Sequence, residues 1–283
     1  MDEERVEFTS ASTISHAWQF TAFHGKNIET ANERHSNMND LEKYFKGNTG
    51  RLIHKWNHYF EIYDRHFSRF RGTDVHIVEF GVSYGGSLQM WKYYFGPHAK
   101  IFGVDINPNC RKLEEDQVHI FIGDQEDRSF LKELTEKIPR IDILIDDGGH
   151  TMQQQINTFE ELFPCIDKNG IYLCEDLHTS YWPKFGGGYR NPETFVEYSK
   201  NFIDHIHAWQ SSQSDVLRVT DFTKSVHSLH YYNGILVIEK RSTEKPFHLK
   251  TGKRTVPGFG TSFSGQLMEL LKQVMDRFTG HAT

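Results

Sequence analysis

The chain has 283 residues, of which 37% are hydrophobic and 14% aromatic, and its formal net charge is -6. This length suits one large α/β domain with extensions, and the apolar content excludes a chain that is disordered throughout. The negative charge disfavours nucleic-acid and anionic-membrane surfaces, so we expect small-molecule partners. Three scattered cysteines and the lack of a signal-like or membrane-spanning apolar run predict a cytoplasmic protein.

The first 70 residues are predicted to form an N-terminal region outside the main domain. Residues 1–48 are polar and rich in Ser, Thr, Asn and His, which is typical of an arm or a loosely helical extension. Residues 52–70 carry apolar side chains at helical spacing, which predicts one amphipathic helix. We expect its aromatic residues to pack on the sheet, with Tyr63 or His58 as alternatives that border a ligand.

Short apolar runs separated by helical stretches follow, and they predict buried parallel strands joined by crossover helices. The runs lie at residues 76–80, 100–104, 119–122, 141–145 and 170–174. Each run ends at or near an acidic residue. Because ligands of such sheets bind outside the carboxyl ends of the strands, these acids are candidate site residues.

Two further segments, 226–232 and 235–238, flank an Asn-Gly pair at Asn233 and Gly234 and predict a hairpin with a type I′ turn. The expected fold is therefore α/β and Rossmann-like, with a mostly parallel sheet, a C-terminal antiparallel hairpin and helices on both faces. We place this domain at residues 71–241. Residues 242–283 are expected to form a loop and a helix, whose apolar stripe packs on the domain or on a second subunit of a homo-oligomer.

The turn after the first predicted strand reads Glu79-Phe-Gly81-Val-Ser-Tyr84-Gly85-Gly-Ser87. Glycine allows the backbone to approach a ligand and to turn sharply into a helix. The spacing is not the Gly-x-Gly-x-x-Gly fingerprint of dinucleotide sites. Glu79 would repel a pyrophosphate but would suit a ligand that carries an amino group and a sulfonium.

The next two strand ends carry Asp105 and then Asp124 with Gln125. A carboxylate in the position of Asp105 accepts hydrogen bonds from both hydroxyls of a ribose. Asp124 and Gln125 suit the edge of an adenine. The alternative for Glu79 and Asp105 is a helix-capping or solvated acid, which three such placements in succession disfavour.

The fourth and fifth strand ends bring together Asp147, Glu175 and Asp176, with His150 one Gly-Gly turn away from the first. Clustered carboxylates repel one another unless a cation or a proton compensates them, and oxygen ligands suit a hard divalent cation. A histidine beside them has the pKa range of a general base. Asp146 either orients the turn or contacts the ligand, and an additional part for His178 stays open.

These motifs together resemble the class I S-adenosylmethionine-dependent methyltransferases, in particular the metal-dependent sugar O-methyltransferases of macrolide biosynthesis. The resemblance spans about residues 50–240. It implies Mg²⁺ held by Asp147, Glu175 and Asp176, with His150 as general base. It also implies a hydroxylated, glycosylated acceptor and S-adenosylmethionine bound by the residues of the first three strand ends, namely Glu79, Gly81, Tyr84, Gly85, Ser87, Asp105, Asp124 and Gln125.

Two other functions are weighed against this expectation. A nicotinamide-dependent oxidoreductase or epimerase would need the missing glycine spacing and would leave the three acids unexplained. A non-catalytic module that binds S-adenosylmethionine would leave the acids solvated. The glycine-rich, aromatic segment 181–190 is interpreted either as a loop that closes over the acceptor or as an ordinary surface loop.

Overall fold

The computed structural model describes residues 38–253, 255, 267–268 and 270–271. Expectations for residues 1–37, and for Val274, Met275 and Phe278 of the C-terminal stripe, lie outside the described residues. Leu267, Leu270 and Leu271 are helical and about half exposed, so no packing of these leucines on the domain is seen. Among the described residues, no helix combines the length and the apolar character needed to cross a membrane.

The described residues are built on one seven-stranded sheet with the order β3-β2-β1-β4-β5-β7-β6. The strands β1 to β5 are parallel, whereas β7 runs antiparallel to both β5 and β6. Their bounds are β1 His76–Phe80, β2 Lys100–Asp105, β3 Val118–Ile122, β4 Ile141–Asp146, β5 Ile166–Cys174, β6 Val226–Tyr232 and β7 Ile235–Lys240. The predicted fold class is confirmed, with each predicted run falling on a strand.

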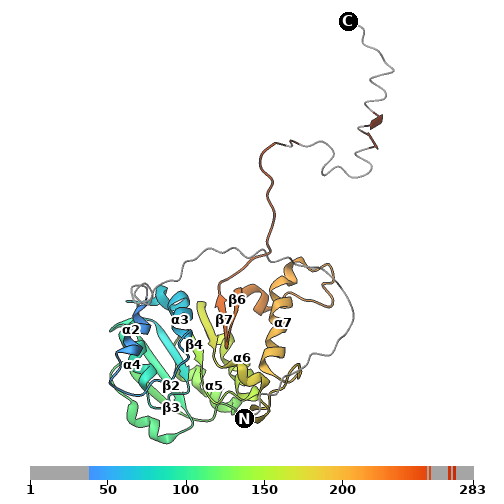
Figure 1. The fold of residues 1–283 in the computed structure, drawn as a ribbon. Helices are drawn as coiled ribbons and strands as arrows, with labels where there is room; N and C mark the ends of the chain where they lie inside the picture. Colours follow the sequence, from blue (N-terminus) through green and yellow to red (C-terminus); the bar gives the residue numbers. More distant parts are fainter. Residues whose placement is uncertain (1–37, 254, 256–266, 269, 272–283) are drawn as a thin grey trace, which may run out of the picture.

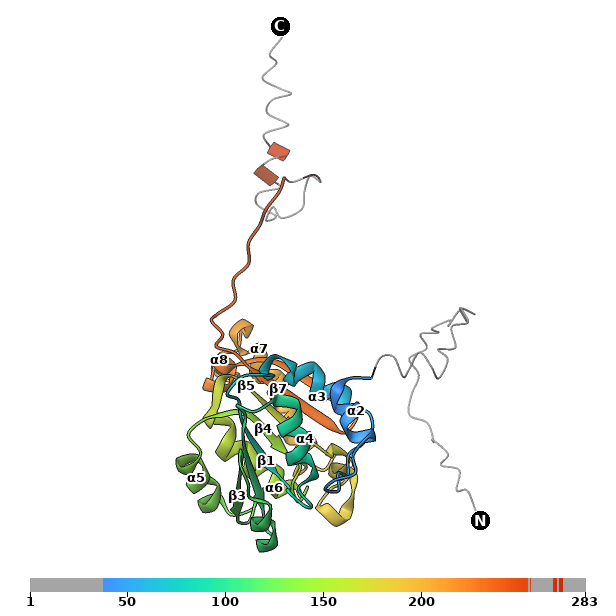
Figure 2. The same cartoon turned by 90° about the vertical axis from the view of Figure 1, so that its left-hand side faces the viewer.

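Helices cover both faces of the sheet (Figures 1 and 2). Figure 1 shows α2, α3 and α4 gathered on one side and α6 and α7 on the other. The helices are α2 Asp40–Lys46, α3 Tyr59–Phe67, α4 Gly86–Phe95, α5 Arg128–Lys137, α6 Met152–Leu162, α7 Phe195–His207 and α8 Asp221–Ser225. The helix α2 lies in the region that the sequence predicts as an arm.

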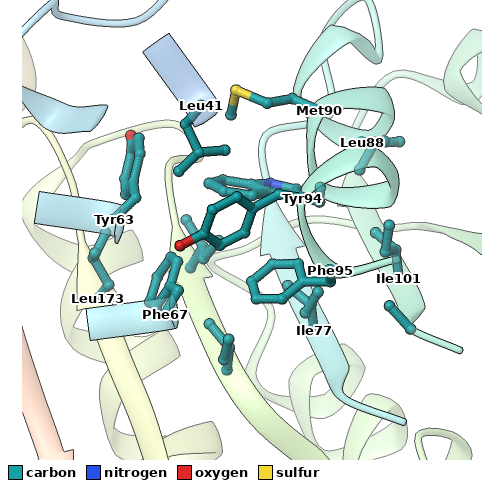
Figure 3. Close-up of a cluster of buried hydrophobic side chains, with 14 of the residues drawn as sticks. Leu41, Tyr63, Phe67, Ile77, Leu88, Met90, Tyr94, Phe95, Ile101 and Leu173 are labelled. Atoms are coloured by element: carbon teal, nitrogen blue, oxygen red, sulfur yellow. The ribbon is translucent and has the colours of Figure 1, made fainter. Parts of the chain in front are cut away.

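The core consists of two apolar layers, one on each face of the sheet, because successive strand residues point to opposite faces. Ile77 and Ile101 belong to one layer, and their neighbours Val78 and Phe102 belong to the other. Figure 3 shows the first layer, in which Leu41, Tyr63, Phe67, Leu88, Met90, Tyr94 and Phe95 from α2, α3 and α4 gather over Ile77, Ile101 and Leu173. This packing fixes α3 over the strands whose ends carry the acidic residues.

The prediction of one helix over residues 52–70 is wrong at its beginning. The helix α3 starts at Tyr59 and is followed by a 3-10 turn at Ser68–Phe70, while residues 52–56 form an irregular segment. The backbone of this segment passes close to α4, where a Cβ on Gly86 would lie 2.2 Å from the carbonyl oxygen of Leu52. Leu52 and Trp56 are 59% and 53% exposed, so they do not continue the buried stripe of α3.

The hairpin of β6 and β7 is confirmed, but its turn is not type I′. Gly234 has a φ of 81°, whereas Asn233 is not among the residues with positive φ, and a type I′ turn needs both. Tertiary contacts hold the turn: His58 Nε2 lies 2.8 Å from the Asn233 carbonyl oxygen, and the amide of Leu177 donates to the Gly234 carbonyl. These contacts, which the local sequence does not reveal, determine the backbone of the turn.

Candidate active site

The acidic residues at the carboxyl ends of the strands surround one cavity of about 610 Å³. This volume lies within the range of small-molecule sites, roughly 300–1,000 Å³. Of the residues predicted to bind a cofactor or a metal or to act as base, Gly81, Tyr84, Ser87, Asp105, Asp124, Gln125, Asp147, His150 and Asp176 line the cavity. Glu79, Gly85 and Glu175 are not among its lining residues.

Gly81, in the turn after β1, lets two strand ends come together. Its φ is 87°, and a Cβ at this position would lie 1.9 Å from the carbonyl oxygen of Asp147. Glycine is therefore needed here for a positive φ and for close contact with the turn after β4. The turn ends at Gly85, which has a φ of 75° and directly precedes α4.

Glu79 lies beneath this turn and is fully buried. The Ser87 hydroxyl donates to its Oε2 at 2.9 Å, while its Oε1 has no hydrogen-bond partner within the described residues. Burial raises the pKa of Glu79 to about 7, although the ammonium of Lys55 lies 3.9 Å away. A buried carboxylate oxygen without a hydrogen-bond partner is available as an acceptor to an amino group.

Asp105 and Asp124 reach the cavity from the ends of β2 and β3. Asp105 accepts hydrogen bonds from the backbone amides of Ser83 and Asn107, at 2.9 and 2.8 Å, and so joins the two turns. Asp124 is exposed and accepts from the amide of Glu126. Their contact with a ribose or an adenine stays a prediction.

Gln125 holds the turn after β4 in place. Its side-chain amide donates to Asp146 Oδ1 at 2.6 Å and to Thr158 Oγ1 at 2.9 Å, and its Oε1 accepts from the amide of Gly149 at 3.1 Å. Asp146 is fully buried, and burial raises its pKa to about 7. Of the two roles considered for Asp146, these contacts support orientation of the turn.

Asp147, His150 and Asp176 converge at the cavity. One oxygen of each carboxylate and one ring nitrogen of His150 all lie within 4.8 Å of one another. His150 Nε2 is 3.8 Å from Asp147 Oδ1 and 3.5 Å from Asp176 Oδ2. The sequence predicts that Asp147, Glu175, Asp176 and His150 meet, and the structure brings three of them together at the cavity without Glu175.

The backbone at this site is strained. Among the described residues, five non-glycine residues have a positive φ, and three of them, Ser83, His150 and Asp176, line the cavity. Such conformations cost about 1–3 kcal/mol each and cluster at functional sites. Two of the three, with φ values of 59° and 54°, are the base and one metal ligand expected from the sequence.

Glu175 is not part of this group and meets Lys55. The Lys55 ammonium lies 2.9 Å from both carboxylate oxygens of Glu175, and it also donates to Asp147 Oδ2. The Tyr63 hydroxyl donates to Glu175 Oε1 at 2.7 Å. Burial lowers the pKa of Lys55, but the neighbouring carboxylates of Asp147, Glu175 and Glu79 reverse this effect and leave its pKa raised, so Lys55 is charged.

Lys55 and Tyr59 are the site residues that sequence reasoning missed. The Tyr59 hydroxyl donates to Asp176 Oδ1 at 2.9 Å, and burial together with this carboxylate raises the pKa of Tyr59, so it remains a donor. The sequence offers Tyr63 as a residue that borders a ligand, whereas its hydroxyl contacts Glu175, a predicted metal ligand. Tyr59 and Tyr63 are four residues apart and so lie on one face of α3. This spacing is the sequence pattern from which their shared position beside the acids could have been predicted.

An aromatic cluster, consisting of Trp56, His178, Trp182 and Phe185, flanks the same site. The ring centroid of His178 is 5.7 Å from that of Trp56 and 4.6 Å from that of Trp182, and Phe185 lies 6.5 Å from His150. Trp56 and Trp182 are 53% and 43% exposed. The cluster is therefore an exposed apolar surface that ends beside the predicted base.

The segment 181–190 is folded back on itself by backbone hydrogen bonds. The amide of Gly187 donates to the Trp182 carbonyl, and the amide of Gly188 donates to the Ser180 carbonyl. A Cβ on Gly187 would lie 2.3 Å from the Thr179 carbonyl oxygen, so the glycine permits this close packing. Closure of the segment over an acceptor stays a prediction.

Comparison with known proteins agrees with this geometry. Residues 78–177 match the model of a methyltransferase domain, and the solved structure of the MycE methyltransferase from the mycinamycin pathway, in complex with Mg, SAH and mycinamycin VI, superposes with a TM-score of 0.66. That structure is 28% identical and aligns with 83% of this chain and 60% of its own. Residues 78–177 thus match a methyltransferase domain, and the fold is shared with the MycE methyltransferase.

Curated proteins are also similar to this chain. The 8-demethyl-8-alpha-L-rhamnosyl tetracenomycin-C 2'-O-methyltransferase of Streptomyces olivaceus is 38% identical over 194 residues, which are 65% of this chain and 50% of the relative. The demethylmacrocin O-methyltransferase of Streptomyces fradiae is 34% identical over 202 residues, covering 67% and 51%. The chain thus spans about half the length of the curated relatives that it matches.

Proposed function

We propose that this protein is a Mg²⁺-dependent O-methyltransferase that moves the methyl group of S-adenosylmethionine to a hydroxyl of a sugar or of a similar polyhydroxylated natural product. The observation that carries the proposal is the convergence of Asp147, His150 and Asp176 at one cavity. The relative from Streptomyces olivaceus, whose name specifies a rhamnosyl tetracenomycin-C, supports a glycosylated acceptor.

The residues of the site fit a hard divalent cation. Three carboxyl groups, those of Glu79, Asp147 and Glu175, surround the ammonium group of Lys55, and a fourth, that of Asp176, lies beside His150. Their oxygens are the donors that Mg²⁺ prefers. Asp147, Glu175 and Asp176 would hold the ion, which when bound would orient neighbouring hydroxyls and stabilise negative charge on oxygen.

The site also fits S-adenosylmethionine. The cavity is bordered by the glycine turn, Asp105 and Asp124, in the order in which a cofactor with an amino acid part, a ribose and an adenine would need them. Glu79 Oε1, which lies 3.9 Å from the Lys55 ammonium and has no hydrogen-bond partner within the described residues, would accept from the amino group. Gln125 is engaged with Asp146 and Gly149, so its contribution to this cofactor site would be made through the turn that it holds.

His150 is the proposed general base. In the transfer the bond between the methyl carbon and the sulfonium sulfur breaks, a bond from that carbon to the acceptor oxygen forms, and the hydroxyl proton passes to the imidazole. The carboxylates of Asp147 and Asp176, 3.8 and 3.5 Å from Nε2, stabilise the imidazolium that results. We place the acceptor beside the aromatic cluster, whose ring faces suit the C–H groups of a sugar.

A methyl-transfer screen over glycosylated metabolites, run with Mg²⁺ and with EDTA, tests the proposal. Calorimetry with S-adenosylmethionine and with NAD accompanies it, and NAD binding in place of S-adenosylmethionine would redirect the search to oxidoreductases. His150→Ala should lower kcat by about 10²–10⁴ while cofactor affinity is retained. His98→Ala, an exposed histidine before β2, is the matched control with normal turnover. Activity indifferent to EDTA would contradict the role of the metal.

A further inference from the structure

The position between Asp147 and Glu175 is taken by the side chain of Lys55. Its ammonium is equidistant, at 2.9 Å, from the two oxygens of Glu175 and also donates to Asp147 Oδ2. A cation held by both oxygens of Glu175 and by Asp147 would occupy this same position. The Lys55 side chain is only 3% exposed, so these contacts are not a surface ion pair.

Lys55 belongs to a segment without regular secondary structure. It lies in the irregular residues 52–56 that precede α3, outside any helix or strand, and the neighbouring Trp56 is exposed. The carboxylates, in contrast, follow the central strands β4 and β5 and are fixed by the sheet. A change in this arrangement would therefore move the lysine rather than the acids.

Lys55 and a divalent ion cannot share these carboxylates. Mg²⁺ binds oxygen at about 2.0–2.1 Å, so an ion on Glu175 and Asp147 Oδ2 would stand within a few ångströms of an ammonium of the same sign of charge. Repulsion at such a distance in a buried site is large. Occupation by one cation therefore excludes the other.

We propose that Lys55 is a tethered cation that holds Asp147 and Glu175 together until a divalent ion displaces it, so that Lys55 sets the affinity of the site for the metal. The inference rests on the proposed function, because it takes Asp147, Glu175 and Asp176 as the ligands of the divalent ion. Lys55 acts as a positioning residue: it keeps the like-charged acids in place for the ion and is exchanged for it.

Lys55→Met tests this proposal through metal binding and stability, without any assay of turnover. The variant removes the competing cation, so calorimetry should show about tenfold tighter binding of Mg²⁺ than in the unsubstituted protein. Without Mg²⁺ the variant should unfold at a lower temperature, because the carboxylates lose their counter-ion, and Mg²⁺ should raise its melting temperature more than it raises that of the unsubstituted protein. Lys55→Gln, which keeps an N–H donor but no charge, gives a second variant for the same comparison.

Lys240→Met is the matched control. Lys240 is also buried, but its ammonium donates to the backbone carbonyls of Phe163 and Ile166 on another part of the sheet. This variant should lose stability without any change in Mg²⁺ affinity. A gain in affinity seen in Lys240→Met as well would assign the effect to general loosening and overturn the proposal.

Mg²⁺ affinity that is unchanged or weaker in both Lys55 variants would also overturn the proposal, as would a lack of Mg²⁺ binding in every form of the protein. The proposed function fails by a different result. If Mg²⁺ binds as expected in all forms but no methyl group is transferred to any glycosylated acceptor, the competition between Lys55 and the ion stands and the assignment as a methyltransferase of sugars does not.

Discussion

The side-chain amide of Gln125 makes three hydrogen bonds that hold the turn after β4, and Gln125→Ala removes all of them. Each is worth about 1 kcal/mol net, and a buried partner left unsatisfied costs more. Asp146 is fully buried and the amide of Gly149 is part of the turn itself. We therefore expect the free energy of unfolding to fall by about 3–4 kcal/mol.

Urea titration followed by circular dichroism measures this loss, and for a domain of this size it corresponds to a fall in melting temperature of roughly 6–16 °C. Gln213→Ala, at an exposed glutamine, is the control and should change stability by less than about 0.5 kcal/mol. The turn carries Asp147 and His150, so Gln125→Ala should also weaken Mg²⁺ binding.

A small loss of stability would favour the role that the sequence assigns to Gln125, which is contact with the adenine of the cofactor. A variant that loses less than about 1 kcal/mol of stability but binds S-adenosylmethionine tenfold more weakly would identify Gln125 as a reader of the cofactor. The structural argument for the turn would then be refuted.

Three further predictions follow from the contacts described above. Trp182→Ala, in the aromatic cluster, should raise KM for the acceptor about tenfold with cofactor affinity unchanged, as steady-state kinetics and calorimetry will show. Burial lowers the pKa of His66 in the folded state. The contribution of the neutral side chain to stability is therefore complete above about pH 6.5 and is lost as the pH falls through the folded-state pKa. His66→Gln should flatten this decline in urea titrations between pH 5 and 8. Gly81→Ala should lower the free energy of unfolding by about 2–4 kcal/mol, because φ is positive and the added Cβ would meet the Asp147 carbonyl oxygen.

Each of these has a result that contradicts it. An unchanged KM together with weaker cofactor binding would move Trp182 to the cofactor side. A pH profile of His66→Gln parallel to that of the unsubstituted protein would show that His66, despite its contacts with Glu239 and Tyr232, does not govern stability in this range. Normal stability of Gly81→Ala would mean that the two turns separate without strain.

The strands were predictable because parallel strands covered on both faces leave nearly continuous apolar runs. The predicted run at 76–80 coincides with β1, and the others fall within or at the edge of their strands. The acids at the strand ends were predictable for the same reason, since parallel strands bring their carboxyl ends to one edge. The meeting of Asp147 and Asp176 beside His150 follows from this, whereas the contact of Glu175 with Lys55 does not.

The errors occur where contacts distant in sequence decide the local structure. The apolar pattern of residues 52–58 is the same whether the segment is a helix or a loop, and only its packing against Gly86 and the acids distinguishes them. Lys55 lies 92 residues from Asp147 and 120 from Glu175, so no local pattern connects them. The type of the Asn233-Gly234 turn depends on His58 and Leu177 in the same way.

The left-handed backbone of His150 and Asp176 has a consequence for protein engineering. Replacement of His150 by glycine or asparagine, or of Asp176 by glycine, would relieve the local backbone strain, which favours stability, while removing a side chain that the proposed chemistry uses. A selection for thermal tolerance alone would therefore drift toward inactive proteins at these two positions. Mutant libraries designed to raise thermal stability should keep both positions constant and vary residues remote from the cavity.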